Sequence, residues 1–457
     1  MLHLFTSRLK LWILVFSSIL LPILFSWSLL SPTPQMLSPS PSSIGSSLLA
    51  SKNLQLQSIE VIQKLWKGYG YICHITATPS GSPYSSFESS RTGSAANSNT
   101  STPQETQSFI LKLITPPKAT RTKEQDEGHL RKIYSYEVEH RFYSELAPLL
   151  PPSVPVAKCL VSLNEQHSDG TSTTAMILSD LRQQYPVAGE KQSELSSTQV
   201  HAALDWLSGF HGFWWPRVKD MDRSRFVYPP LEEVKRDANI PRNKSVWLNG
   251  GYTYLATRRT EYGKLASDRG NEWNEPLTDY EEGEPSISEI VADILAVRTN
   301  EGSSSVPTEG YQTLIHGDVK SENFFTSLSG KEVAFYDFQY VGQGLGVCDL
   351  AKLFTCSVPL AMLVTYPDAS LGRELGMQSG EKALLKRYWT HLTELSKKEY
   401  DWDVFVMHWE VALVDWLRFQ ASWGFWGNTE WLEARVRFIL KDQRWRGLVK
   451  RDWMSRH

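Results

Sequence analysis

Three polar side chains near the middle of the chain have the types and spacing that phosphoryl transfer requires. Asp318 and Asn323 stand in LIHGDVKSENFF, and Asp337 follows the apolar run EVAFY. A carboxylate can orient a hydroxyl and accept its proton, while amide and carboxylate oxygens are ligands that Mg²⁺ prefers. The pattern predicts a phosphoryl-transfer centre, in which positioning and charge neutralisation do most of the catalysis. The alternative is that these residues only cap turns, where Asp and Asn are common.

Two neighbouring features would complete such a centre. Lys320 lies between Asp318 and Asn323 and would bring a positive charge near the transferred phosphate. The runs NFFTSL and EVAFYDF have the pattern of two paired strands, and a hairpin formed by them would bring the two predicted metal ligands together.

The combination of motifs is more specific than any one of them. HGDxxxxN followed by an Asp after a strand resembles the catalytic loop and metal-binding segment of the aminoglycoside phosphotransferase and choline kinase-like superfamily. The run DFQYVGQGLGVCDLAKLF resembles the fungal and algal kinase-like branch near the ecdysteroid-kinase-like proteins. The resemblance covers most of residues 55–440. It implies an α+β, bilobal protein-kinase-like fold and transfer from ATP, with Mg²⁺, to a hydroxyl of a small molecule.

The resemblance also assigns roles to individual residues. Asp318 would be the catalytic carboxylate, assisted by Lys320, and Asn323 and Asp337 would hold the metal. A later acidic residue, Asp349, would brace the catalytic loop, and His316 would support the same loop.

The first half of the chain contains the nucleotide-binding residues that the resemblance implies. Lys112 in FILKLITPP resembles the strand lysine that holds the nucleotide phosphates. Glu139 in YEVEHRFY resembles the helix glutamate that pairs with this lysine, although Glu137 competes for that role.

Two further segments would contact the nucleotide. WKGYGY, with Gly68 and Gly70, occupies the place of the loop that covers the nucleotide, but two glycines fall short of GxGxxG, and a plain hairpin turn is the alternative. ILSDL resembles the hinge between the lobes, where backbone groups around Leu178 and Asp180 would meet the adenine.

The phosphate acceptor would bind in the second, helical lobe. Asp415 and Arg418 would contact a polar acceptor, and Trp423 and Trp426 would stack on it. The alternative is that these side chains only pack the last helices together. The motifs do not choose among choline, amino sugars, homoserine and steroid alcohols, which related proteins phosphorylate.

Hydrophobic periodicity predicts the elements that position these residues. Five strand-like runs and one helix occupy residues 53–185, the expected nucleotide-binding lobe, and helical patterns dominate residues 186–457. Within the first lobe, residues 78–106 are rich in Ser, Gly, Asn and Pro, which is typical of a disordered loop.

Residues 1–52 are expected to be a hydrophobic targeting segment followed by an unstructured spacer. Leu11–Leu30 is twenty residues without a charge, preceded by Arg8 and Lys10, which is long enough to cross a bilayer as a single-pass anchor or to serve as a secretory signal. A transit peptide, a misassigned start or a buried helix are the alternatives. A secretory or membrane location is therefore expected, with a cytoplasmic or organellar one as the alternative.

Composition excludes several other classes of protein. A formal net charge of −3 leaves no basic excess for phosphate-backbone contacts, so nucleic-acid binding is not expected. The four cysteines form no CxxC pair, which argues against a zinc site and a disulfide scaffold.

Three functions remain, of which a small-molecule kinase is favoured. A protein kinase is less consistent with the motifs, because HGD replaces HRD, DFQ replaces DFG and no APE-like segment follows. A catalytically silent binding or scaffold protein on a kinase fold is the third, since intact residues do not prove turnover.

Overall fold

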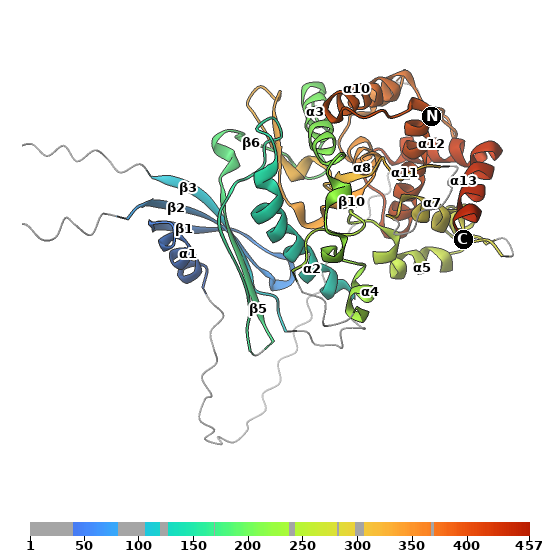
Figure 1. Cartoon of the computed structure of the whole chain (residues 1–457). Coiled ribbons are helices and arrows are strands. Elements are labelled where there is room, and N and C mark those ends of the chain that lie inside the picture. The colour runs from blue at the N-terminus through green and yellow to red at the C-terminus, as the bar shows by residue number, and fades with distance from the viewer. Residues whose placement is uncertain are drawn as a thin grey trace, which may run out of the picture. The chain divides into compact units, whose positions relative to one another are not determined.

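The computed structural model describes residues 40–80, 106–118, 127–168, 170–236, 243–280, 283–297, 306–366 and 370–457 (Figure 1). The expected anchor, Leu11–Leu30, and most of the expected loop 78–106 lie outside these residues. Within the described ranges, no helix combines the length and the apolar character needed to cross a membrane.

The first lobe is built on a five-stranded antiparallel sheet, as the strand-like runs predicted. The strand order is β1-β2-β3-β5-β4. The strands are β1 (Leu54–Lys64), β2 (Gly70–Pro79), β3 (Gln107–Ile114), β4 (Cys159–Gln166) and β5 (Ser172–Ser179). Because side chains alternate between the faces of a strand, Leu111 and Leu113 lie on the opposite face of β3 from Lys112. Lys112 thereby faces the second lobe.

Helix α1 (Pro41–Ala50) covers the outer face of this sheet, opposite the face that carries Lys112. Ser40 caps the helix by accepting a hydrogen bond from the backbone N–H of Ser43, and the proline follows at the first helical position. Leu48 and Leu49 are buried against the strands. The expectation of an unstructured spacer through residue 52 is therefore wrong from residue 41 onward, because a capped helix with an apolar face forms there.

Helix α2 (Glu127–Arg141) packs between the sheet and the second lobe, and a π-helical turn at Phe142–Leu146 continues it. Its side chains Tyr136 and His140 are buried. Glu139 is buried on the same helix, facing Lys112.

The second lobe is mainly helical. Its helices are α3 (Ser197–Trp214), α4 (Pro230–Lys235), α5 (Arg259–Ser267), α6 (Asn274–Thr278), α7 (Ile287–Leu295), α8 (Val347–Cys356), α9 (Leu360–Leu363), α10 (Ser379–Ser396), α11 (Trp402–Trp423), α12 (Thr429–Lys441) and α13 (Gln443–Arg456). Helix α3 packs along α10, and α11 contacts α5, α7, α8 and α12. Helices α12 and α13 are separated at Asp442, which caps the start of α13.

Two small strand pairs hold the segment that carries the predicted chemistry. They are formed by β7 (Thr313–Ile315) with β10 (Gly342–Gly344), and by β8 (Phe324–Thr326) with β9 (Val333–Phe335), which β6 (Val187–Ala188) joins at its edge. The β8–β9 hairpin confirms the pairing predicted for NFFTSL and EVAFYDF. The backbone N–H of Tyr336 donates to the carbonyl of Asn323 at 2.9 Å, so Asn323 and Asp337 emerge from the same end of the hairpin.

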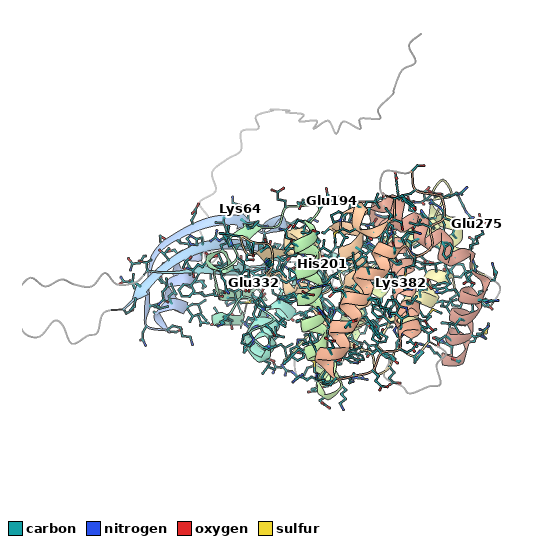
Figure 2. The ribbon with its side chains drawn as sticks, turned by 90° about the horizontal axis from the view of Figure 1, so that it is seen from above. Lys64, Glu194, His201, Glu275, Glu332 and Lys382 are labelled. Carbon is teal, nitrogen blue, oxygen red and sulfur yellow. The ribbon has the colours of Figure 1, made fainter. Side chains whose placement is uncertain are left out.

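The arrangement confirms the α+β, bilobal fold. Figure 2 shows the division from above, with Lys64 on the sheet and Glu275 at the far, helical end. The buried residues of the helical lobe are continuous with those on the inner face of the sheet, whereas the outer face has its own cluster under α1.

Replacing Leu49 by Ala tests whether α1 belongs to the folded lobe. The Leu49 side chain is fully buried, so its loss should lower the free energy of unfolding by about 2–5 kcal/mol. Urea and thermal unfolding, followed by tryptophan fluorescence, measure the change. Ser46→Ala, on the exposed face of the same helix, is the matched control. Equal midpoints for the two variants would show that α1 contributes no stability to the sheet.

Candidate active site

The loop 316–323 connects β7 to β8 and is held by buried polar contacts. The Asp349 carboxylate, from α8, accepts hydrogen bonds from the backbone N–H groups of His316 at 2.7 Å and Gly317 at 2.9 Å. His211 Nε2, from α3, lies 3.2 Å from the same carboxylate. Burial alone would raise the pKa of Asp349, but the contact with His211 and nearby basic groups lower it below its ordinary value. A buried, ionised carboxylate thus fixes the backbone just before Asp318.

His316 and Gly317 contribute to the structure of this loop in different ways. His316 Nε2 donates to the carbonyl of Tyr336 at 2.9 Å, which ties the loop to the end of the β8–β9 hairpin. Burial lowers the pKa of His316, so its ring is neutral in this position. Gly317 has φ +85°, and a Cβ there would lie 2.3 Å from the carbonyl oxygen of Tyr340. Only glycine allows the close approach of these two segments.

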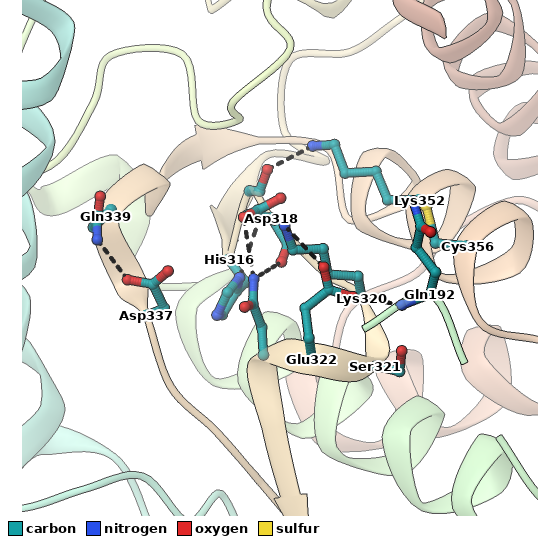
Figure 3. Close-up of polar contacts among 12 residues, drawn as sticks. Gln192, His316, Asp318, Lys320, Ser321, Glu322, Asp337, Gln339, Lys352 and Cys356 are labelled. Carbon is teal, nitrogen blue, oxygen red and sulfur yellow. Dashed lines mark hydrogen bonds and ion pairs between the residues drawn. The ribbon is translucent and has the colours of Figure 1, made fainter. Parts of the chain in front are cut away.

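Asp318 and its neighbours form a compact charged group (Figure 3). Lys320 Nζ lies 3.2 Å from Asp318 Oδ2 and 3.5 Å from Glu322 Oε1. Burial opposes the charge on Lys320, but these two carboxylates outweigh it, so the pKa of Lys320 is raised above its ordinary value. Asn323 Nδ2 donates to the backbone carbonyl of Asp318 at 2.7 Å and to its Oδ2 at 3.1 Å. The amide oxygen of Asn323 is therefore turned away from Asp318.

Lys112 joins the two lobes at this site. Its Nζ lies 2.6 Å from Glu139 Oε2 and 3.2 Å from Asp337 Oδ1, so Glu139, rather than Glu137, is the helix carboxylate that meets the strand lysine. Burial opposes the charge on Lys112, but the two carboxylates outweigh it and raise the pKa of Lys112 above its ordinary value. Burial would likewise raise the pKa of Asp337, but Lys112 reverses this and lowers it.

Gln339 is a residue of this site that the sequence analysis missed. Its Nε2 donates to Asp337 Oδ1 at 2.7 Å, and its Oε1 accepts a hydrogen bond from Ser135 Oγ at 3.2 Å. Ser135 lies one helical turn before Glu139 on α2, so Gln339 connects that helix to the Asp337 carboxylate. The glutamine of the DFQ motif, at the position where a protein kinase has glycine, was the signal that could have indicated it.

One cavity of about 770 Å³ is lined by seven of the sixteen predicted site residues. Lys112, Asp318, Lys320, Asn323 and Asp337 all line it. Residues with no predicted role also line it, among them Lys132, Tyr136, Tyr252, Gln339, Tyr340, Lys352, Trp416 and Phe419.

The four residues predicted at the nucleotide-covering loop and the hinge are not among the described residues that line this cavity. Gly68 lies in the β1–β2 turn, and Gly70 starts β2, where a Cβ would lie 1.9 Å from the carbonyl oxygen of Leu113. The close approach of β3 to β2 therefore explains why residue 70 is a glycine. Leu178 is buried in β5, and the Asp180 carboxylate caps the following turn and lies 2.8 Å from Arg182 Nη2.

The four residues predicted at the acceptor site divide into two pairs. Trp423 and Trp426 line the cavity, and Trp423 is 51% exposed. Asp415 and Arg418 are not among the lining residues and pair with each other, with Arg418 Nη2 at 2.7 Å from Asp415 Oδ1. The fully buried guanidinium of Arg418 also donates to the carbonyl of Thr253 at 2.7 Å. For Asp415 and Arg418, this geometry agrees with the alternative that the side chains only pack the last helices together.

Six aromatic side chains form one wall of the cavity, here called the aromatic wall: Tyr252, Tyr340, Trp416, Phe419, Trp423 and Trp426. Neighbouring rings are in contact, with centroids 4.9 Å apart for Tyr252 and Tyr340 and 5.9 Å apart for Phe419 and Trp423. Three of the six come from α11 and two from segments beside the loop 316–323. The cavity thus has a charged end at Lys112 and Asp337 and an aromatic end at α11.

Comparison with solved structures finds small-molecule kinases with low sequence identity. An amicoumacin kinase in complex with AMP-PNP, Ca²⁺ and amicoumacin is 13% identical, with 88% of this chain and 91% of that chain covered and a TM-score of 0.35. The choline kinase of Streptococcus pneumoniae is 12% identical, with 89% and 98% covered and a TM-score of 0.32. The ethanolamine kinase of Plasmodium vivax is 10% identical, with 91% and 93% covered and a TM-score of 0.34.

The family assignment rests on the sequence rather than on those structures. A search of curated proteins finds no match. The model of the ecdysteroid kinase-like family matches residues 89–371, a range that includes Lys112, Glu139 and the loop 316–323. The match spans more than half of the 457 residues. The chain therefore belongs to the ecdysteroid kinase-like family, and within the matched range the strand lysine and the loop carboxylate line one cavity while the helix glutamate pairs with the lysine.

Proposed function

We propose that this protein is an ATP- and Mg²⁺-dependent phosphotransferase that phosphorylates a hydroxyl group of a small molecule. The observation that carries the proposal is the position of Lys112, between Glu139 at 2.6 Å and Asp337 at 3.2 Å, in the cavity that Asp318 also lines. A phosphoryl-transfer site needs a cation for the phosphates, metal ligands and a group that orients the acceptor. Membership of a family of kinase-like proteins supports the same reaction class.

Lys112 is the group proposed to hold the nucleotide phosphates. Glu139 fixes the lysine from α2, and the raised pKa of Lys112 keeps it positively charged at neutral pH. Because the ion pair is buried, the position of Nζ is restricted, and less side-chain freedom is lost when phosphates bind. Lys320, on the other side of Asp318, would neutralise charge on the transferred group.

The oxygens of Asn323 and Asp337 fit a magnesium ion that arrives with the nucleotide. The described residues contain no group of three or more His, Cys, Asp and Glu side chains that could hold a metal by themselves. Mg²⁺ is commonly bound by one or two protein oxygens and completes its shell with phosphate and water. The amide nitrogen of Asn323 is taken by Asp318, and Asp337 Oδ1 is taken by Lys112 and Gln339. These contacts leave the Asn323 amide oxygen and Asp337 Oδ2 for the ion, which when bound would neutralise phosphate charge.

Asp318 is the group proposed to act on the acceptor. The acceptor oxygen forms a bond to the γ-phosphorus while the bond between that phosphorus and the bridging oxygen breaks, which releases ADP. The hydroxyl proton passes to the Asp318 carboxylate. Asp349 and His316 act through the backbone of the loop and are positioning residues, since neither lines the cavity among its described residues.

Replacing Asp318 by Asn tests the reaction. The amide keeps the size of the side chain but cannot take the proton, so kcat should fall by about 10²- to 10⁴-fold while Mg·ATP still binds. Phosphate transfer from labelled ATP is measured with the full chain and a panel of choline, ethanolamine, amino sugars, homoserine and steroid alcohols. Asp205→Asn, on the surface of α3 and outside the cavity, is the matched control.

Two outcomes would contradict the proposal. A wild-type protein that neither binds Mg·ATP nor exceeds Asp318→Asn with any acceptor would be a silent kinase-fold binding protein. Faster labelling of protein substrates than of every small molecule would identify a protein kinase instead.

Replacing Gln339 by Leu tests the support of the Asp337 carboxylate. The change removes a 2.7 Å hydrogen bond to a charged group, which is worth about 1.5–3 kcal/mol, so the Mg²⁺ concentration for half-maximal nucleotide binding should rise about 10- to 100-fold. Calorimetric titration of a non-hydrolysable ATP analogue at several Mg²⁺ concentrations measures this without turnover. Ser135→Ala removes the contact on the far side of the amide, together with a hydrogen bond to the carbonyl of Lys132 within α2, and should have a smaller effect. An unchanged Mg²⁺ dependence in Gln339→Leu would show that Asp337 needs no such support.

A further inference from the structure

The turn between β1 and β2 stands where a loop covering the nucleotide was predicted, but part of its backbone is engaged in closing the turn. The N–H of Gly68 donates to the carbonyl of Leu65 at 3.2 Å, and the N–H of Leu65 donates to the carbonyl of Gly70 at 2.9 Å. A glycine-rich loop holds phosphates with backbone N–H groups that point at the ligand. Two N–H groups of this turn point at its own carbonyls instead, so the phosphates would need donors from other groups.

The ion-pair groups of the site do not supply an excess of positive charge. Two groups each combine one lysine with two carboxylates: Lys112 with Glu139 and Asp337, and Lys320 with Asp318 and Glu322. In its formal state each group therefore has one negative charge in excess. A nucleoside triphosphate is still an anion after it has bound one Mg²⁺. Because like charges repel strongly in a medium of low polarity, a further cation beside the phosphates would be favourable.

Lys132 brings a further cation into the same cavity from α2. Its side chain is partly buried and lines the cavity, as do Leu65 and Ile72 on either side of the β1–β2 turn. Lys132 precedes Tyr136 by one helical turn, so the two side chains lie on the same face of α2. The Nζ of Lys112 lies 5.7 Å from the centroid of the Tyr136 ring. The two lysines thus reach the cavity on either side of one aromatic ring.

The position of Lys132 is also tied to the β1–β2 turn. Its Nζ lies 5.6 Å from the centroid of the Tyr69 ring, which is buried beneath the turn. The rings of Tyr69 and Tyr136 are neighbours, with centroids 6.1 Å apart. An ammonium group over an aromatic ring keeps its charge and its remaining N–H donors for a second partner.

The surroundings of Lys132 favour an anion. Burial lowers the pKa of Lys132, and although the Asp337 carboxylate opposes this, the positive charges of nearby basic side chains lower it further; these are Lys67, Lys112 and Arg131. Lys67 belongs to the β1–β2 turn itself and is exposed. Several cations that repel one another are stabilised together when a polyanion binds between them.

We propose that Lys132, assisted by Lys67, binds the phosphate chain of the nucleotide with side-chain ammonium groups, in the role that the backbone N–H groups of a glycine-rich loop would otherwise have. Lys132 would contact phosphate oxygens from α2, and Lys67 would approach them from the turn. Both are binding residues, and neither exchanges a proton with the acceptor. This inference rests on the proposed phosphotransferase function and adds the groups that recognise its phosphate donor.

Replacing Lys132 by Met tests the inference without turnover. Methionine keeps an unbranched apolar stem over Tyr69 but removes the charge, so the dissociation constant of AMP-PNP with Mg²⁺ should rise about 10- to 100-fold. Adenosine has no phosphate, and its dissociation constant should change less than about threefold. Calorimetric titration of the full chain measures both, with adenosine also measured by displacement of AMP-PNP. Lys67→Met should weaken AMP-PNP less, by about three- to tenfold, because the charge of an exposed lysine is screened by solvent.

Two further variants separate the role of the charge from structural damage. Lys132→Arg retains the positive charge and should bind AMP-PNP within about fivefold of the wild type. Lys64→Met removes an exposed lysine of β1 that is not among the described residues lining the cavity, and it should leave both dissociation constants unchanged (Figure 2). A merely structural role of Lys132 would weaken adenosine and AMP-PNP by the same factor.

The outcomes distinguish failure of the inference from failure of the proposed function. AMP-PNP binding that is unchanged in Lys132→Met, or that is lost equally in Lys132→Arg, would overturn the role of Lys132, and so would an equal loss of adenosine binding. Unchanged AMP-PNP binding in Lys67→Met would remove Lys67 from the proposal. A wild type that binds AMP-PNP through Lys132 but transfers phosphate to no acceptor would overturn only the proposed function.

Discussion

The site depends on one ion-pair group, in which the buried Lys112 contacts the buried Glu139 and the partly exposed Asp337 at the same time. The three residues come from the sheet, from α2 and from the end of the β8–β9 hairpin, so the group is complete only when both lobes are folded and joined. Losing one partner would leave a buried charge uncompensated, which is more costly than the pair is favourable. The group therefore acts as a constraint on the relative position of the lobes, and a nucleotide would meet a lysine whose place is already determined.

The loop 316–323 is also held by polar contacts, which here satisfy buried backbone groups. Asp349 satisfies two buried N–H groups of the loop, and His316 satisfies the carbonyl next to Asp337. Asp337 itself has φ 65° and ψ 57°, a left-handed conformation that is uncommon outside glycine. Because Lys112 and Gln339 both hold its carboxylate, the contacts of the side chain compensate for an unfavourable backbone. The geometry of the proposed metal ligands is thus set by hydrogen bonds rather than by apolar packing.

How much of this could be predicted depended on whether the signal was local. Strand alternation and the β8–β9 hairpin are properties of consecutive residues, and both were predicted correctly. Ser40 and Pro41 were an equally local start signal for α1, but the surrounding Ser and Pro residues favoured a spacer. The contacts of Gln339 and Lys352 join segments that are far apart in the sequence. The apolar residues around Lys352 in α8 do not indicate which group the lysine contacts. Asp415 and Arg418, three residues apart on one helix, had the spacing of a pair that satisfies itself.

The two ends of the cavity are built from different interactions, which under the proposed function would separate the transfer reaction from the choice of acceptor. At the phosphate end, each carboxylate is shared with a lysine, and a change at one residue disturbs the others. At the end where the acceptor is proposed to bind, the rings of α11 and the amine of Lys352 line the cavity without taking part in those ion pairs. Substitutions on α8 and α11 could therefore change which alcohol binds while the contacts of Lys112 and Asp337 stay intact. Within a common fold, acceptor class would then be decided by a few side chains on two packed helices.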